Sequence, residues 1–342
     1  DLLVGHNSWE DYNEMLRIFK HYHYAHKAVN QASGNSEFRF SMSSYPGLLS
    51  STDDYYQLGN GLVVVETTLV ILDTTILGHM LTEAVPAWLA SLTANQLAHS
   101  AQDWSHIFQL YNAWTYNCQW MIVDYPKFRQ SQKDGGGLKA GTFWVLETLP
   151  GTAIAQDMTM QLNRDGYWLS ANRPYFPPVR SLAGYDRGGS NALTSFSENP
   201  RAKIAEDKVR NRVCDIDGMM WFLRYNDFQH DERSSNDPSY AIASRADLNS
   251  NRPTPNGAVD AKCVDAASTR RMQTYAISGP TAQGQVPFAF IGRWTTVPHR
   301  GMPPIFQFDW TRLTGFQATK HPNATDEPQQ TTSLQILHRS CG

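Results

Sequence analysis

The stretch GLVVVETTLVIL, residues 61–72, is built almost entirely from β-branched and large apolar residues. Such residues fit a pleated, buried surface, so the stretch is predicted to be a buried strand. Upstream of it, Phe38, Phe40 and Met42 alternate with polar residues, which predicts a half-buried strand. The turn-forming residues Ser44–Gly47 end that strand. A sheet is therefore expected at the centre of the fold.

Strands are also predicted over 120–125 and 142–148, joined by a connection that holds the glycines of 134–137, and over 274–277. The residues from about 234 to 256 are rich in Ser, Asn, Asp and Pro and are predicted to form a long loop.

Helices are predicted in three places. Ser8 is a candidate N-cap with Asp11 at the capping-box position, and Tyr12, Met15, Leu16 and Phe19 would then share one helical face.

The residues from about 81 to 111 are predicted to form two helices, and 219–225 a short apolar one. Helices and strands come in groups, which favours an α+β fold with mainly antiparallel sheets over a doubly wound fold. Residues 1–316 are assigned to the main part of a single domain, and 317–342 to a C-terminal tail.

The composition of the 342 residues excludes several classes of protein. Hydrophobic residues make up 41% and charged residues 18%, as in a globular chain and not in a disordered one. The formal net charge of -3, with Lys and Arg spread along the chain, does not fit a nucleic-acid binder. The apolar runs are too short to span a bilayer, so no transmembrane segment is predicted.

Several weak signals together favour a secreted or lysosomal protein. The chain starts at Asp1 and not at Met, which leads us to expect that the true N-terminus lies upstream. Asn323 opens the sequon Asn323-Ala324-Thr325 and is the candidate glycosylation site. The four cysteines, an even number, are compatible with disulfides in any of three pairings: Cys118, Cys214, Cys263 and Cys341.

Most candidate sites have an ordinary explanation. His21, His23 and His26 resemble a metal box, but on a helix only two of them share a face, so an exposed helix end is favoured over a metal role. The glycines of 134–137 lack the Lys-Ser/Thr of a phosphate loop and predict a turn. The pair Asp53-Asp54 is assigned to a loop turn, because adjacent side chains on a strand point apart.

No Gly-x-Ser-x-Gly elbow is present, which argues against an α/β-hydrolase lipase. From the residues alone, His6 would be a surface or loop histidine before a capped helix, and Asn172 and Arg201 would be loop residues. Composition and spacing therefore predict a soluble α+β protein and no particular activity.

A set of short sequence blocks is more informative than composition and spacing. The blocks follow one another in a fixed order from Asp1 to about Trp310. They are 1–9 (DLLVGHNSW), 15–18 (MLRI), 43–47 (SSYPG), 53–56 (DDYY), 66–68 (ETT), 115–125 (TYNCQWMIVDY), 172–176 (NRPYF), 199–204 (NPRAKI), 224–228 (RYNDF), 245–249 (RADLN) and 275–281 (YAISGPT). In these blocks the chain resembles the phospholipase B-like family. Gly301–Pro303 and Phe308-Asp309 favour the phospholipase B-like 1 branch over its paralogue.

The resemblance implies an N-terminal-nucleophile hydrolase, whose core is an αββα four-layer sandwich. In this family a precursor cleaves itself to expose a Cys, whose thiol attacks a carbonyl while its own α-amine serves as the base. The resemblance also implies a lysosomal location, no cofactor and no metal, and an N-terminal fragment of the same precursor as partner. It leaves the oligomeric state open, with a homo-oligomer as one alternative.

Residue by residue, the resemblance assigns five positions to the catalytic pocket. His6 and Trp9 match the pair beside the nucleophile, and Thr68 matches a pocket residue at the end of a strand. Asn172 matches the expected donor to the oxyanion. Arg201 matches the cation that orients the nucleophile's amine or the substrate, and near a free α-amine it would lower the pKa of that amine.

Two departures from the family pattern matter. The nucleophilic Cys of the family lies shortly upstream of the Leu-Val-Gly-His block, a stretch that this sequence does not contain. Cys118 stands where the family usually has Asn and is predicted to be a buried thiol at a strand edge. Two functions therefore stay open: a hydrolase of acyl ester or amide bonds in lipids, or a catalytically inactive lysosomal lipid-binding protein that kept the fold.

Overall fold

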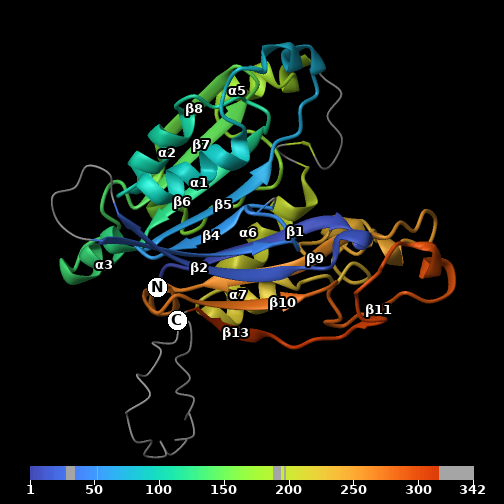
Figure 1. The fold of residues 1–342 in the computed structure, drawn as a ribbon. Coiled ribbons are helices and arrows are strands. Elements are labelled where there is room, and N and C mark those ends of the chain that lie inside the picture. Colours follow the sequence, from blue (N-terminus) through green and yellow to red (C-terminus); the bar gives the residue numbers. More distant parts are fainter. Residues whose placement is uncertain (28–34, 52, 188–193, 196–197, 316–342) are drawn as a thin grey trace, which may run out of the picture.

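The structure is a computed structural model that describes residues 1–27, 35–51, 53–187, 194–195 and 198–315. The predicted tail 317–342, with Asn323 and Cys341, lies outside these residues. Most strands of the described residues belong to two large sheets, and helices cover the outer side of each, as Figure 1 shows.

The larger sheet is an antiparallel meander of seven strands in the order of the chain. Its strands are β2 (Ile18–Lys27), β3 (Asn35–Ser44), β4 (Tyr55–Leu58), β5 (Leu62–Thr68), β6 (Cys118–Asp124), β7 (Phe143–Leu149) and β8 (Thr152–Asp157). The second sheet has four antiparallel strands in the order β1-β9-β10-β13. They are β1 (Val4–Asp11), β9 (Asn256–Val264), β10 (Gln273–Ser278) and β13 (Thr311–Thr314).

The remaining elements are helices and one small ribbon. The α-helices are α1 (Ala87–Leu97), α2 (Ala101–Gln109), α3 (Tyr125–Lys133), α4 (Thr159–Asp165), α5 (Pro177–Leu182), α6 (Pro200–Arg212), α7 (Ile216–Leu223) and α8 (Ala266–Arg270). Strands β11 (Phe288–Ala289) and β12 (Ile305–Phe306) form the ribbon. The 3-10 helices are η1 (Tyr12–Glu14), η2 (Thr74–His79), η3 (Tyr185–Arg187), η4 (Glu232–Ser234), η5 (Pro238–Tyr240), η6 (Ala246–Leu248) and η7 (Gly292–Thr296).

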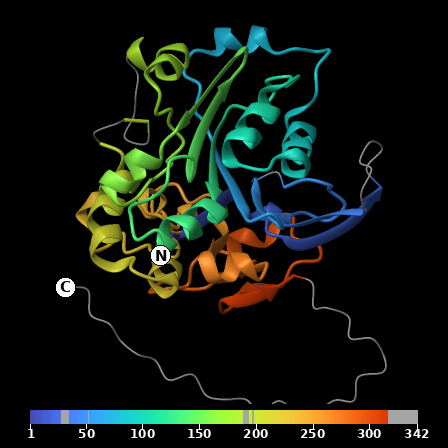
Figure 2. The same ribbon diagram turned by 90° about the vertical axis from the view of Figure 1, so that its left-hand side faces the viewer.

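The elements stack in four layers, with helices on the two outer sides (Figures 1 and 2). On one side, Trp104 and Phe108 of α2 pack with Trp120 against the outer face of the seven-stranded sheet. On the other, Leu223 of α7 packs on Ala261 of the four-stranded sheet. The two sheets pack face to face through an apolar core that both contribute to. The αββα order expected from the resemblance, with antiparallel sheets, is therefore confirmed.

A buried ion cluster joins the two sheets. Lys262 of β9 lies 2.9 Å from Asp53, which precedes β4, and 2.7 Å from Asp260. Arg17 contacts the same carboxylates, at 2.6 Å and 2.9 Å. Burial alone would raise the pKa of Asp53, but Lys262 and Arg17 outweigh burial and hold it well below its usual range. The hydroxyl of Ser8 in β1 is hydrogen-bonded to Asp53 and Lys262 of this cluster. The cluster therefore fixes where β1 lies relative to the larger sheet.

Several predictions are confirmed. The stretch 61–72 contains β5, the alternating 38–42 lies in β3, and the Ser44 turn ends β3. The two helices expected in 81–111 are α1 and α2, and the predicted 219–225 helix is α7, shifted by about one turn.

The helix predicted to start at Ser8 is wrong. Residues 4–11 form strand β1, and 18–27 form strand β2, with only the three-residue η1 between them. Ser8 does not cap a helix, because its hydroxyl is engaged by Asp53 and Lys262 in the ion cluster. Val4, His6 and Ser8 are the buried members of an alternating pattern along β1, so tertiary packing overrides the local capping pattern.

Candidate active site

The five residues that the resemblance assigned to the pocket all line one cavity, of about 350 Å³. They come from different elements: β1, the end of β5, the segment after α4 and the first turn of α6. These residues are His6, Trp9, Thr68, Asn172 and Arg201. The fold therefore brings together side chains that lie almost 200 positions apart in the sequence.

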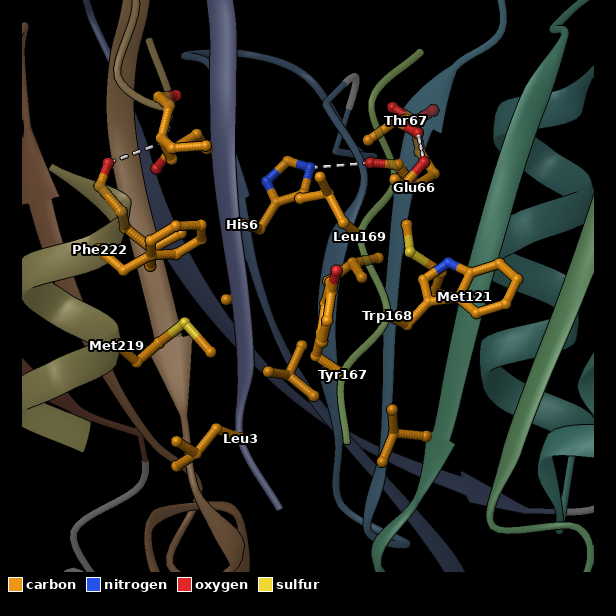
Figure 3. Close-up of a pocket in the computed structure, with 18 of the residues that line it drawn as sticks. Leu3, His6, Glu66, Thr67, Met121, Tyr167, Trp168, Leu169, Met219 and Phe222 are labelled. Carbon is orange, nitrogen blue, oxygen red and sulfur yellow. Dashed lines mark hydrogen bonds between the residues drawn. The ribbon is translucent and has the colours of Figure 1, made fainter. Parts of the chain in front are cut away.

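The rest of the cavity wall is largely apolar. Figure 3 shows Met219 and Phe222 on one side, carried by α7, and Leu169 and Met121 on the other. Leu3 completes this wall at the start of the chain. A wall of this kind, with a few polar groups between the apolar ones, suits an aliphatic ligand.

His6 is buried on β1 and points toward the larger sheet, not to the surface as predicted from its residues alone. Its Nε2 lies 2.9 Å from the carbonyl oxygen of Glu66, which can only accept, so Nε2 carries the proton (Figure 3). Nδ1 is buried and has no hydrogen-bond partner among the residues that the structure describes. Burial, reinforced by the positive charge of Lys262, lowers the pKa of His6 to about 4. The imidazole is therefore neutral, with an unpaired acceptor at Nδ1.

Asn172 holds the end of β5 to the start of α6. Its backbone is left-handed, with φ at 60°, a conformation that Asn adopts more readily than most residues. Its Nδ2 donates to the carbonyl of Thr68 at 2.8 Å, and its Oδ1 accepts from Nη1 of Arg201 at 2.8 Å. One Nδ2 hydrogen is left for a ligand, because the amide has two.

Arg201 stands in the first turn of α6, not in a loop as predicted from its residues alone. The sequence does contain a signal for the start of this helix. Asn199 is the N-cap and accepts from the Ala202 amide, and Pro200 occupies the first helical position. The guanidinium lies over the Trp9 ring, with Cζ 4.6 Å from the ring centroid. Burial and the neighbouring Arg173 lower the pKa of Arg201 to about 10, so it remains a cation at physiological pH.

A carboxyl pair that the sequence did not point to lies beside the cavity. Glu66 lines it, and the Glu66 amide donates to the carbonyl of Asp54 at 3.1 Å, which places the two residues opposite one another. Both side chains are buried, and within the described part of the chain Glu66 Oε2 and Asp54 Oδ1 have no hydrogen-bond partner of ordinary geometry. Burial raises the pKa of Glu66 to about 8, and burial with the nearby Glu66 raises that of Asp54. Tyr116 donates to Glu66 Oε1 at 2.9 Å.

The pair Asp53-Asp54 does lie outside helices and strands, as predicted, and its two carboxyls have different surroundings: Asp53 contacts Lys262, whereas Asp54 is influenced most by Glu66 among the neighbouring charges. Both are buried, however, which the assignment to a simple loop turn did not foresee. The signal that could have found them is the position of two acids directly before a strand of apolar and aromatic residues.

Other candidates do not form sites. His21 and His23 lie on strand β2, so the predicted helix end is wrong, and the ring of His21 is 2.7 Å from the Ser41 hydroxyl. Over the described residues no group of His, Cys, Asp and Glu could hold a metal ion. The glycines of 134–137 follow α3, in line with the predicted turn. No helix in the described part of the chain is long and apolar enough to cross a bilayer.

Two of the cysteines are buried free thiols. Cys118 begins β6, as predicted for a thiol at a strand edge, and burial raises its pKa well above the usual range. Cys263 lies in β9, and burial raises its pKa as well. Neither forms a disulfide within the described residues, and their raised pKa values keep both thiols protonated, so neither is an activated nucleophile.

Comparison with known proteins gives one family. The profile of the family described as Phospholipase B matches residues 1–313. The chain is 35% identical to phospholipase B-like 1 of Bos taurus over 315 residues, which are 92% of this chain and 56% of that protein. The human protein of the same name gives 35% identity over 92% of this chain and 55% of its own length. The chain thus spans about half the length of these relatives.

A relative with a different name and a solved structure also match the chain. Phospholipase B of Crotalus adamanteus is 31% identical over 92% of this chain and 55% of its own length. Among solved structures, a mutant of conjugated bile acid hydrolase from Clostridium perfringens aligns with a TM-score of 0.43 and 11% identity. That alignment covers 81% of this chain and 85% of the hydrolase.

Proposed function

Because the chain belongs to the phospholipase B family, we propose that it forms the larger part of a lipid acyl hydrolase. In this proposal the enzyme cleaves acyl ester or amide bonds through the thiol of an N-terminal Cys. That Cys precedes Asp1 in the precursor and is freed by self-cleavage. The N-terminal fragment of the precursor remains bound as a partner of this chain. The observation that carries the proposal is the convergence of the five pocket residues on one cavity.

The chemistry follows the rules of an N-terminal nucleophile. The α-amine of the Cys takes the thiol proton while sulfur attacks the acyl carbonyl carbon. The tetrahedral intermediate collapses to a thioester, and the resulting ammonium returns the proton to the leaving alcohol or amine. Water, deprotonated by the amine, then hydrolyses the thioester and regenerates the thiol. A segment joined to Asp1 would start at the cavity wall, since Asp1 itself lines the cavity.

The pocket residues have separate tasks in this scheme. Asn172 supplies its remaining Nδ2 hydrogen to the oxyanion, and its amide is held in place by Thr68 and Arg201. His6, neutral and with Nδ1 unpaired, accepts a hydrogen bond from the α-amine and so orients its lone pair toward the thiol. Trp9 covers the guanidinium of Arg201 and keeps water from it.

A lysosomal location is part of the proposal. The buried carboxyls support it, because Glu66, with a pKa of about 8, and Asp54 favour their protonated forms in the folded chain. An acidic lumen keeps both neutral and so removes the repulsion between them.

A test uses a protein extended upstream of Asp1 and assayed on an acyl lipid. Asn172→Ala is expected to lower kcat by about 10²–10³, since one oxyanion donor is removed. It also loses the bonds to Thr68 and Arg201 and places Ala in a left-handed backbone, so its stability is measured alongside, and the assay is run where the variant is folded. Asn163→Ala is a matched control, because Asn163 lies on α4 and does not line the cavity. Unchanged turnover in Asn172→Ala would remove Asn172 from the oxyanion role.

N-terminal sequencing and intact mass of every polypeptide in the same preparation complete the test. A fragment that begins with Cys and has a free α-amine is the expected result. Ser or Ala at that position, or an uncleaved precursor, together with no turnover, would instead favour an inactive lipid-binding protein.

A further inference from the structure

A second cavity, of about 280 Å³, lies behind one wall of the cavity described above. The two cavities share the consecutive residues 167–169, and the rest of the second cavity comes from β6, α4, α6 and the segment 173–175. In Figure 3 the ring of Trp168 extends from the shared segment toward the larger sheet. The proposed acyl chemistry uses the first cavity, so the second has no assigned role.

Gln119 of β6 is the most deeply buried polar residue of the second cavity, with 1% of its surface exposed. Its Nε2 donates to Glu147 Oε1 at 2.6 Å, and its Oε1 accepts from the Trp168 indole at 3.2 Å. These two bonds fix the orientation of the amide, because an indole N–H can only donate. One amide hydrogen and one lone pair remain for a ligand, and a hydroxyl group can use both.

The charged residues that line the second cavity are one cation and one anion, Arg173 and Asp165. Asp165 accepts from Gln161 of the same helix and from Nε of Arg164. Arg173 donates to the carbonyl of Ser195. Because both signs of charge are present, a ligand with a net charge is attracted by one group and repelled by the other. The cavity therefore favours a neutral ligand that both donates and accepts hydrogen bonds.

Two aromatic rings supply an apolar wall for such a ligand. The rings of Trp168 and Tyr175 have centroids 4.7 Å apart and are tilted by 51°. Since the rings contact each other, no planar ligand can be sandwiched between them, and a ligand has to lie across them. Tyr175 is 40% exposed, so solvent reaches this wall. A pyranose ring matches the wall, because its faces carry C–H groups and its edge carries hydroxyl groups.

We propose that the second cavity is a saccharide subsite that binds one neutral hexose unit. The C–H face of the sugar lies on Trp168 and Tyr175, and its hydroxyl groups bond to Gln119, Gln161 and Asp165. The inference goes beyond the proposed hydrolase, because it concerns a cavity that the acyl chemistry leaves unused. Two sources share this chemistry: the sugar headgroup of a glycolipid, whose tail would enter the first cavity past the shared segment, and a sugar without a lipid tail.

Heteronuclear NMR of this chain follows binding at the Trp168 indole N–H, whose signal is identified by its loss in Trp168→Phe. The probes are the methyl glycosides of glucose, mannose and galactose. Cyclohexanol, a ring with a single hydroxyl, and glutamine, a zwitterion, are the comparison ligands. At least one methyl hexoside is expected to shift the signal saturably and to bind at least about 10-fold more tightly than either comparison ligand. Because the ligand is neutral, its Kd should be the same in about 0.05 M and about 0.5 M NaCl.

The octyl glycoside of the preferred hexose, used below its micelle concentration, distinguishes the two sources. Binding at least about 10-fold tighter than that of the methyl glycoside, with a shift of the Trp9 indole signal in the first cavity, identifies a glycolipid headgroup. Equal binding of the two glycosides identifies a sugar without a lipid tail.

A pair of Tyr variants connects the binding to this cavity. Tyr175→Ala removes part of the aromatic wall and is expected to weaken binding of the methyl hexoside by about 3–10-fold. An unshifted Trp168 signal in the ligand-free variant shows that the cavity is intact. Tyr111→Ala is the matched control, because Tyr111 is 80% exposed and lines neither cavity, and it is expected to bind the hexoside as the unmodified chain does.

Three results would overturn the inference: no shift of the Trp168 signal with any methyl hexoside, cyclohexanol or glutamine binding as tightly as the hexoside, or unchanged hexoside binding in Tyr175→Ala. None of these experiments measures acyl transfer. The failure of the saccharide subsite is therefore distinguishable from the failure of the proposed hydrolase, which would show as an absence of acyl transfer in the extended protein.

Discussion

The imidazole of His6 lies between two sheets, opposite Lys262 on the neighbouring strand and 6.4 Å from the Tyr55 ring. Its folded pKa, about 4, is below the ordinary value of 6.5, so the unfolded chain binds more protons between these values. The stability that neutral His6 contributes is present above pH 6.5 and is lost as the pH falls through about 4.

We expect heteronuclear NMR to show His6 as the Nε2–H tautomer with a pKa of about 4. The exposed His230, paired with Asp227 on the surface, serves as reference in the same spectra. In Lys262→Met, the loss of the nearby cation is expected to raise the pKa of His6, whereas the exposed Lys139→Met leaves it unchanged. Titration of His6 at an ordinary value in the unmodified chain would contradict this assignment.

At this scale the residues alone could not identify the site. Nothing in the neighbourhood of His6 distinguishes a buried pocket histidine from a surface one, and it was the block resemblance that selected it. The left-handed backbone of Asn172 and the stacking of Arg201 on Trp9 depend on contacts between distant segments. Such contacts leave no local signal in one sequence.

Among the elements, the open end of the β4–β5 hairpin, where Asp54 and Glu66 face each other, carries the clearest pH dependence. Glu66 has a folded pKa of about 8 against an ordinary value of 4.5, so the folded chain binds more protons than the unfolded chain between them. Its contribution to stability is therefore greatest at acid pH and declines as the pH rises through about 8. The pKa of Asp54, which lies opposite Glu66, is also raised, so Asp54 changes the stability with pH in the same direction.

Glu66→Gln is expected to flatten this dependence. The amide keeps the acceptor for Tyr116 and offers a donor toward Asp54, and it cannot ionise. The free energy of unfolding of the unmodified chain is expected to fall as the pH rises from about 5 to about 8. In the variant this fall should be smaller by at least about 2 kcal/mol. Urea unfolding at a series of pH values measures this, with the exposed Glu232→Gln as control. If the free energy of unfolding of Glu66→Gln depends on pH as it does in the unmodified chain, Glu66 and Asp54 are not the source of that dependence.

Strands with a strong apolar pattern were predictable, and so was helix α7 to within about one turn, whereas helices α3 and α6 were not predicted. The stretch 61–72 and the alternating 38–42 identified β5 and β3, because burial on one face leaves a period of two. The capping pattern at Ser8 led to a wrong helix prediction, because the Ser8 hydroxyl is hydrogen-bonded within the ion cluster, to residues far away in the sequence. Helix α3 was missed, although Asp124 caps it and Pro126 lies in its first turn.

The whole molecule is organised by the contact between its two sheets. The ion cluster of Arg17, Asp53, Asp260 and Lys262 ties them together at one place, and the apolar core fills the rest. The cavity lies where β1 forms the edge of the smaller sheet, next to α6 and α7. The layer order was predictable from the resemblance, whereas the ion cluster was not, because its members are scattered from Arg17 to Lys262 in the sequence.

The most direct measurement is mass spectrometry of the acyl-enzyme in a protein extended upstream of Asp1. After mixing with an acyl lipid and rapid acid quenching, the fragment that begins with Cys should gain the mass of one acyl chain. The adduct should be absent when that Cys is replaced by Ala, and reduced in Asn172→Ala. Turnover of lipid without an adduct on that Cys, or an adduct on another residue, would contradict the account.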